Sequence, residues 1–279
     1  MRSRRFIQCD VFSAVPTRGN ALAVVVDGDG LSEEQMRRFA AWTNLAETTF
    51  LLPPEDPSAD YKVRIFTPTR EMPFAGHPTL GSCTAWLDSG GVPRDVHVVR
   101  QECGVGIVEI DISRENELAF KAPPTKVQPL PADMQQAILG ALDIPPEAVL
   151  RAARLDNGPV WQVLELNTAE AVLAVDSSRV RWPEFKAIGL LGAHPAGGEC
   201  DYEVRMLAPS SGMREDPITG SLNSALACWM RAEGRLDREL RIAQGTSIGR
   251  CGRVSIRPLG EDVWIGGQTH VLIQGSVSL

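Results

Sequence analysis

The sequence predicts an α+β protein of two similar domains, each a sheet wrapped around a central helix. Three observations lead to this expectation. The chain has 279 residues, which is more than one core usually needs and about enough for two domains. It contains an internal repeat of a strand-like segment followed by a helix-like segment. Both helix-like segments are apolar or small on nearly all sides, a pattern typical of a buried helix.

The internal repeat is visible by eye. Residues 61–68, YKVRIFTP, return as residues 202–209, YEVRMLAP, an offset of 141 residues. Each copy is followed by a proline-containing segment, HPTLGS beginning at His77 and DPITGS beginning at Asp216, with an offset of 139 residues. Proline is favoured at the first helical position, because its fixed φ suits a helix and its missing N–H would be unpaired there. We therefore expect His77 and Asp216 to be the N-caps of two equivalent helices.

Another helix is indicated before the first copy. Ser32 is a good N-cap residue, and Gln35 three positions later completes a capping box. This helix should end near Asn44, where a β-rich run follows at once. Glu47 is therefore expected at a helix-to-strand junction.

The domain boundary is expected in the proline-rich run 121–131, which cannot form strand or helix hydrogen bonds continuously. The predicted domains are residues 1–122 and 123–269. A further helix should follow the boundary at residues 132–142. A last strand, residues 270–279, can complete either domain.

The composition excludes several classes of protein. A net charge of −7 argues against general nucleic-acid binding, and no apolar run is long enough to cross a bilayer. The six cysteines form no C-x-x-C pair and have no histidine partner at zinc spacing, so we expect neither a disulfide framework nor a metal. No nucleotide-binding motif occurs, and the basic start lacks the apolar region of a signal peptide. We expect a cytoplasmic protein that needs no cofactor.

The two helix starts suggest a binding site. Helix N-termini carry unpaired N–H groups and partial positive charge, so two of them facing one cleft would bind a carboxylate. The expected partner is thus a small anionic metabolite, held near Gly76, Gly220 and Ser221. Capping alone would explain Asp216, whereas histidine is not a preferred cap. The equivalent positions of His77 and Asp216 in the repeat favour a pair across the cleft.

Four separate motifs together resemble the phenazine-biosynthesis isomerase family, which shares the diaminopimelate-epimerase fold. They occur in order along nearly the whole chain, at residues 44–50 (NLAETTF), 73–81 (PFAGHPTLG), 215–221 (EDPITGS) and 244–250 (QGTSIGR). The resemblance implies two domains, each a β-barrel around a central α-helix, in a chain that usually forms a homodimer.

The resemblance also implies roles for individual residues. Glu47 would be the general acid/base, with His77 and Asp216 orienting the substrate. The residues expected around the bound acid are Gly76, Thr219, Gly220 and Ser221. The best-understood member of the family isomerises trans-2,3-dihydro-3-hydroxyanthranilate without a cofactor, by transferring a proton between ring carbons.

Two departures separate this chain from that member. Ala46 stands where the phenazine enzyme has a serine, and Leu222 and Asn223 follow Ser221 where many members have alanine. The expected function is a cofactor-independent isomerase that moves a proton on a small cyclic carboxylic or amino acid in an interdomain cleft. Two alternatives stay open: an epimerase or racemase of an amino acid, and a binding protein without turnover. The related epimerases use two cysteines, and neither copy has one at its helix start.

Overall fold

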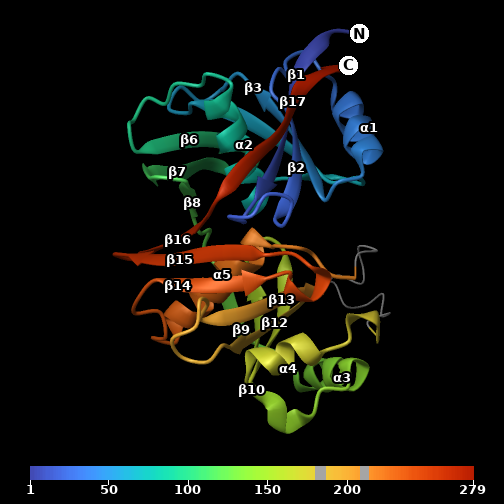
Figure 1. Cartoon of the computed structure of the whole chain (residues 1–279), viewed down its shortest axis with the longest axis vertical. Coiled ribbons are helices and arrows are strands. Elements are labelled where there is room, and N and C mark those ends of the chain that lie inside the picture. Colours follow the sequence, from blue (N-terminus) through green and yellow to red (C-terminus); the bar gives the residue numbers. More distant parts are fainter. Residues whose placement is uncertain (180–186, 208–213) are drawn as a thin grey trace. The chain divides into compact units, whose positions relative to one another are not determined.

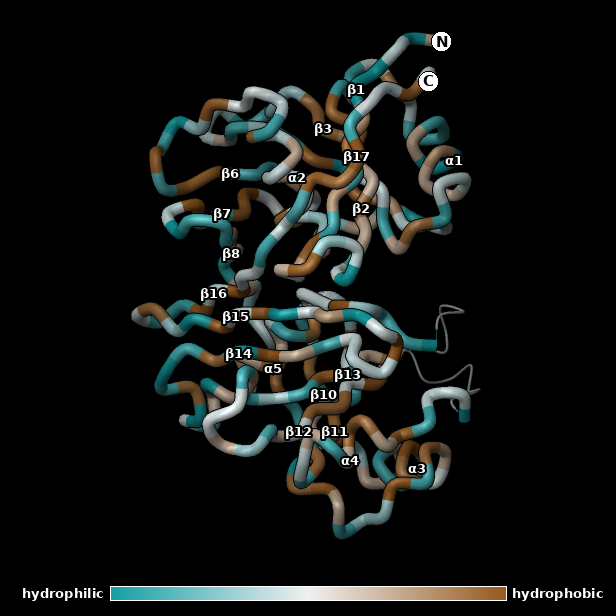
Figure 2. The backbone as a smooth tube through the Cα atoms, in the orientation of Figure 1, coloured by the Kyte–Doolittle hydropathy of each residue, from teal (hydrophilic) through white to brown (hydrophobic). Residues whose placement is uncertain are grey.

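The computed structural model describes residues 1–179, 187–207 and 214–279, and it is a mixed α/β protein dominated by strands (Figure 1). The chain forms two compact units. The first contains Met1–Lys121 and Gly266–Leu279, and the second contains Ala122–Ile265. Hydrophobic segments lie along the strands and helices of both units (Figure 2), and each unit contains a cluster of buried hydrophobic side chains.

The first unit is a curved series of paired strands around one helix. The strands pair in the order β17-β1-β2-β3-β4-β6-β7-β8, with β2–β3 and β4–β6 parallel and the other pairs antiparallel. Helix α2 (Gly76–Asp88) contacts strands from both ends of this series, β17 and β8, as well as β1, β2, β3 and β6. The other elements are β1 (Ser3–Val11), β2 (Asn20–Val25), α1 (Glu33–Thr43), β3 (Glu47–Leu52), β4 (Tyr61–Phe66), β5 (Glu71–Met72), β6 (Val98–Cys103), β7 (Gly106–Arg114), β8 (Glu117–Lys121) and β17 (Thr269–Ser278).

The second unit repeats this plan. Its strands pair in the order β9-β10-β11-β12-β13-β14-β15, with β11–β12 and β13–β14 parallel. Helix α5 (Gly220–Ala232) is buried on most sides. The other elements are β9 (Lys126–Pro129), α3 (Ala132–Leu142), β10 (Val149–Asp156), β11 (Val160–Leu166), α4 (Ala169–Ala174), β12 (Ile188–Ala193), β13 (Tyr202–Leu207), β14 (Leu240–Gln244), β15 (Gly252–Leu259) and β16 (Asp262–Gly267), with 3-10 turns at Pro146–Ala148, Ser177–Arg179 and Thr246–Ile248.

The predicted internal repeat is confirmed. From β1 and from β10 onward, the successive pairings run antiparallel, parallel, antiparallel, parallel, antiparallel. Helices α1 and α4 occupy the first parallel crossover, and α2 and α5 occupy the second. The matching sequences found in the repeat are strands β4 and β13. The two units are therefore copies of one supersecondary plan.

The prediction that His77 caps the first helix is wrong. Helix α2 begins at Gly76 with Ala75 as N-cap, so His77 and Pro78 lie inside the first turn. A proline is tolerated there because none of the first-turn N–H groups has an intrahelical acceptor. Proline is therefore compatible with any of the first three helical positions, whereas the prediction placed it at the first.

The prediction that Asp216 caps the second helix is also wrong. Helix α5 begins at Gly220 with Thr219 as N-cap. The N–H of Asp216 donates to the carbonyl of Met206 at 2.9 Å, which ties Asp216 to the end of β13 instead. Aligned by their first residues, the helices are offset by 144 positions, so His77 corresponds to Ser221. Because the connection before the helix differs in length between the two copies, the His-Pro and Asp-Pro segments do not occupy equivalent positions relative to their helices.

Other local predictions are confirmed. Ser32 and Gln35 form both bonds of the capping box, and α1 ends at Asn44, whose φ of 55° is left-handed. Strand β3 begins at Glu47, the predicted junction. One expectation differs: the proline-rich run contains β9, which pairs with β10. Proline is compatible with an edge strand that pairs on one side.

Two helix glycines provide a test of this packing. A Cβ at Gly81 in α2 would lie 2.5 Å from Leu22 Cδ2 and 3.0 Å from Val11 Cγ2, and both neighbours are fully buried. We expect Gly81→Ala to lower the free energy of unfolding by about 1–3 kcal/mol, as overpacking does. At Gly140 in α3 a Cβ would meet nothing within 4 Å, so Gly140→Ala should raise it by up to about 1 kcal/mol through helix propensity. Urea denaturation of both variants measures the difference, and equal effects would contradict the buried position of α2.

Candidate active site

Glu47 and His77 are brought together in the first unit. Glu47 starts β3, held beside β2 by the parallel pairing of Leu22 with Glu47. His77 lies in the first turn of α2, which packs against β2 and β3. His77 Nε2 is 3.4 Å from Glu47 Oε2, and the two side chains are 6% and 17% exposed. The acid/base candidate is thus largely buried and in contact with the imidazole.

Asn20 is a further polar residue of this cluster. It is the first residue of β2 and is 3% exposed. Its amide Nδ2 is 3.4 Å from His77 Nδ1. Because an amide nitrogen can only donate, Nδ1 is the acceptor and a neutral ring carries its proton on Nε2. That proton faces Glu47. Asn20 was not among the predicted site residues, although an asparagine at the start of an otherwise apolar strand often indicates a buried polar contact.

Burial keeps His77 uncharged. Desolvation lowers its pKa from 6.5 to about 3, because a charged imidazolium loses its hydration in this interior. At neutral pH the contact with Glu47 is therefore a neutral N–H facing a carboxyl group. Such a donor can orient a carboxylate without adding a positive charge that would weaken it as a base.

The first turn of α2 is open to an anion. Its N-cap is Ala75, which has no side-chain oxygen to accept from the first N–H groups. Gly76 and His77 are buried at this end of the helix. Backbone amides and the helix dipole at such a position attract a carboxylate. If His77 had been the N-cap, its imidazole ring would lie against these backbone amides.

The remaining predicted residues lie in the second unit, around the first turn of α5. Asp216 and Thr219 are each 6% exposed, and the Thr219 hydroxyl donates to Asp216 Oδ2. Gly220 and Ser221 are the first two residues of α5, and the Thr219 side chain makes no cap hydrogen bond. The amides of this turn are consequently not satisfied by a side-chain cap.

Two fully buried amides in this region, Gln244 and Asn223, were not predicted as site residues. Gln244 ends β14 and hydrogen-bonds to Thr219, and Asn223 hydrogen-bonds to Gln244. Gln244 opens one of the four family-like motifs, which was the available signal. The predicted pairing of His77 with Asp216 joins residues of different units and stays a prediction.

The cysteines are poor candidates for acid/base catalysis. All six are free thiols. Burial raises the pKa of Cys83 well above its ordinary value, and burial also raises the pKa of Cys228. In the described ranges, no group of three or more His, Cys, Asp or Glu side chains is arranged to hold a metal ion.

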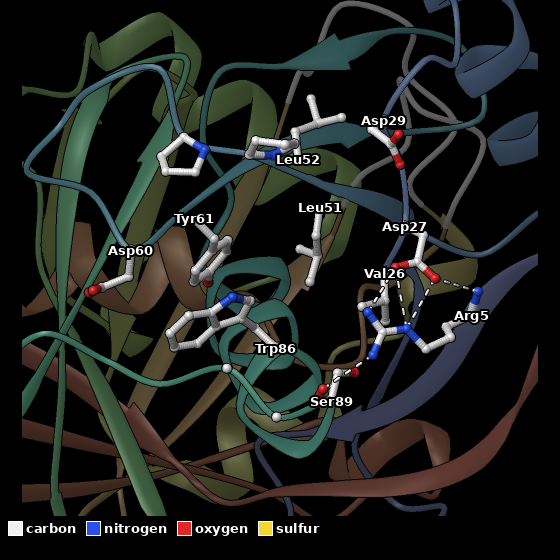
Figure 3. Close-up of a pocket in the computed structure, with 14 residues that line it drawn as sticks. Arg5, Val26, Asp27, Asp29, Leu51, Leu52, Asp60, Tyr61, Trp86 and Ser89 are labelled. Carbon is white, nitrogen blue, oxygen red and sulfur yellow. Dashed lines mark hydrogen bonds and ion pairs between the residues drawn. The ribbon is translucent and has the colours of Figure 1, made fainter.

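A separate pocket lies at the opposite end of α2 (Figure 3). This cavity of about 370 Å³ is bordered by Arg5, Asp27, Tyr61, Trp86 and other residues of the first unit. Its polar groups already have partners: Arg5 pairs with Asp27 at 2.8 Å, and the Tyr61 hydroxyl donates to Gln101 at 2.8 Å. The Tyr61 and Trp86 rings stack on each other. These contacts support a structural role for the pocket residues.

The four motifs and the repeated strand-and-helix plan define an isomerase of the phenazine-biosynthesis type. The chain belongs to the PhzC-PhzF family, described as phenazine biosynthesis-like protein, whose model matches residues 9–276. The protein "Antisense-enhancing sequence 1" of Schizosaccharomyces pombe is 35% identical over 99% of this chain and 99% of its own length. The trans-2,3-dihydro-3-hydroxyanthranilate isomerase of Pseudomonas fluorescens is 32% identical over 88% of this chain and 87% of its own.

The fold is shared with a solved member of the same family. The crystal structure of the PhzF-family phenazine biosynthesis protein of Bacillus anthracis matches with a TM-score of 0.84 at 22% sequence identity, covering 100% of both chains. Among the residues that the structure describes, no helix has the length and apolar character needed to span a bilayer.

The depressed pKa of His77 predicts how stability depends on pH. Between about pH 6.5 and 3 the unfolded chain binds a proton at this residue and the folded chain does not. This contribution to stability is complete above pH 6.5 and is lost as the pH falls, by at most about 1.4 kcal/mol per pH unit. His77→Asn removes this titration, so the difference in free energy of unfolding between variant and wild type should shift in favour of the variant as the pH falls from 6.5 to 4 in urea titrations.

A matched control is His97→Asn, because His97 is exposed. Its stability should run parallel to that of the wild type across the same pH range. Parallel curves for His77→Asn and wild type would show that His77 is not buried as a neutral ring.

Proposed function

We propose that this chain is a cofactor-independent isomerase that moves a proton on a small cyclic carboxylic or amino acid, with Glu47 as the general acid/base. The observation that carries the proposal is the 3.4 Å contact between Glu47 and a buried, neutral His77 at the start of α2. A carboxyl group in such surroundings is largely shielded from water and faces the imidazole N–H. Those are the conditions under which a carboxylate serves as a catalytic base.

The proton would leave and return through the same side chain. The Glu47 carboxylate abstracts a proton from an activated carbon, and the resulting acid delivers it to another carbon of the same molecule. One C–H bond breaks and one forms, so the reaction needs no oxidant, reductant or co-substrate. His77 Nε2 lies 3.4 Å from Glu47 Oε2 and would orient the carboxylate while the proton moves.

The substrate's carboxylate would bind at helix N-termini. The N-cap side chains of α2 and α5 make no cap hydrogen bond, so the backbone at Gly76 and around Thr219, Gly220 and Ser221 would face the substrate's carboxylate, and Asp216 would orient the rest of the molecule. We propose that the two units are two domains, each a β-barrel around its central helix, and that residues of both hold the substrate in a cleft. A homodimer in the cytoplasm is part of the same proposal.

The alternatives have less support. A two-thiol epimerase needs cysteines that ionise, whereas burial raises the pKa of both Cys83 and Cys228. The named substrate of the Pseudomonas fluorescens relative is a cyclic amino acid, which supports that substrate class here. Ala46, Leu222 and Asn223 depart from the family pattern and favour a related substrate over the identical one.

Replacing Glu47 by Gln tests the mechanism directly. The change keeps size and hydrogen-bonding reach but removes the ability to carry a proton, so kcat should fall by about 10²–10⁴-fold while KM changes little. The assay follows deuterium incorporation from D₂O into trans-2,3-dihydro-3-hydroxyanthranilate and a panel of cyclic amino acids. Glu34→Gln, at an exposed position in α1, is the matched control and should retain wild-type turnover.

Full turnover by Glu47→Gln would rule out Glu47 as the proton carrier and direct attention to His77. A wild-type protein whose melting temperature rises with a ligand, but which exchanges no deuterium into it, would favour the binding-protein alternative.

A further inference from the structure

We infer that Gln244 is a positioning residue for Asp216: its side-chain amide obliges the Thr219 hydroxyl to donate to the Asp216 carboxylate and so fixes that carboxylate beside the start of α5. The inference rests on the proposed function only in giving Asp216 a role toward substrate. The positioning itself follows from hydrogen bonds within the second unit.

The orientation of the Gln244 amide is determined by its neighbours. The backbone N–H of Thr219 can only donate, and it lies 3.1 Å from Oε1 of Gln244, so that atom is an oxygen. Asn223 gives a second constraint. Its Nδ2 donates to the carbonyl of Thr219 at 2.9 Å, and it also donates to the same Oε1 at 2.9 Å. Two independent donors thus identify the acceptor end of Gln244.

The other end of Gln244 is therefore the donor end. Nε2 donates to the Thr219 hydroxyl at 3.0 Å and to the carbonyl of Asp216 at 3.4 Å. A hydroxyl has one proton to give. Since Thr219 accepts from Gln244, its proton is available for Asp216 Oδ2, which it contacts. The chain of donors runs in one direction, from Gln244 through Thr219 to Asp216.

Burial gives this arrangement its strength. Gln244 and Asn223 are 0% exposed, and Thr219 and Asp216 are 6% exposed. Hydrogen bonds away from water are stronger, and an unmade one is more costly, than at a surface. Asn223 belongs to the segment that departs from the common family pattern, and its contact with Gln244 gives that departure a structural purpose.

The first unit contains a similar chain of hydrogen bonds, which ends at a different acceptor. Gln101 in β6 is fully buried, and its Nε2 donates to the Thr79 hydroxyl of α2 at 3.1 Å. Thr79 in turn donates to the carbonyl of Ala75 at 2.9 Å. There the chain of donors ends on backbone, whereas in the second unit it ends on a carboxylate. This comparison supplies a matched control.

The residue before Asp216 is held by an ion pair of its own. Glu215, the adjacent residue, is held by Arg205 through two bonds of 3.1 and 2.7 Å. Arg205 also donates to the carbonyls of Val172 and Val175 at the end of α4. This ion pair fixes the backbone next to Asp216, and Gln244 and Thr219 act on the carboxylate itself.

The experiment replaces the donor by an acceptor. In Gln244→Glu a second carboxylate would face Thr219 and compete with Asp216 for the single hydroxyl proton. The Asp216 carboxyl signal, followed by NMR with ¹³C-labelled aspartate and assigned with Asp216→Asn, should then titrate at least about one pH unit higher than in wild type. Thr219→Val should shift it in the same direction, and Thr219→Ser should restore the wild-type midpoint.

Gln101→Glu is the control, because it places an equally buried carboxylate in the other unit without touching Thr219. It should leave the Asp216 midpoint unchanged. An unshifted midpoint in both Gln244→Glu and Thr219→Val would overturn the inference, as would an equal shift in Gln101→Glu. If Gln244→Glu fails to fold, Thr219→Val and Thr219→Ser provide the test. The same Asp216 titration midpoint in these two variants would overturn the inference.

The pH profile of deuterium exchange separates this inference from the proposed function. If the acid limb of kcat/KM moves upward together with the Asp216 signal, both are supported. If the signal moves and the acid limb does not, Gln244 still positions Asp216, and it is the substrate role of Asp216 in the proposed function that fails.

Discussion

The burial of α2 and α5 on nearly all sides is the constraint on which the rest of the structure depends. A surface helix leaves its first N–H groups to water, but a helix enclosed by strands cannot. Its first turn must find partners among side chains or in a ligand. In both helices the N-cap side chain makes no such bond. At α5 a buried amide, Gln244, accepts from the backbone N–H of Thr219, and polar side chains gather at the starts of both helices.

The two copies meet this demand with different chemistry. In the first unit a neutral imidazole stands beside a carboxyl group, and the absence of a positive charge there comes from burial. In the second unit, the Gln244 amide donates to the Thr219 hydroxyl, which in turn donates to the Asp216 carboxylate. Both copies contain the same strand, crossover and helix, and divergence at a few positions placed a carboxyl group beside an imidazole in one and a carboxyl group beside a hydroxyl in the other.

The sequence predicted the features that depend on local rules. The capping box at Ser32, the helix over Ala132–Leu142 and the start of β3 at Glu47 follow from residues adjacent in the chain. The repeat was visible because β4 and β13 share tyrosine, valine and arginine at equivalent positions. The helix caps could not be assigned, because proline is compatible with the whole first turn and the two connections differ in length. Asn20 and Gln244 acquire their partners only through tertiary contacts, so no spacing in the sequence identifies them.

Strand β17 pairs along the whole of β1, and the two ends of the chain exchange hydrogen bonds between Arg2 and Leu279 (Figure 1). The first unit is therefore assembled from segments separated by the entire second unit. During translation, β1 leaves the ribosome early and keeps one edge open until β17 follows the strands of the second unit. An open strand edge invites pairing with other chains. Synthesis from the N-terminus to the C-terminus therefore favours folding of the second unit before the first. The pairing of β17 with β1 then completes the first unit.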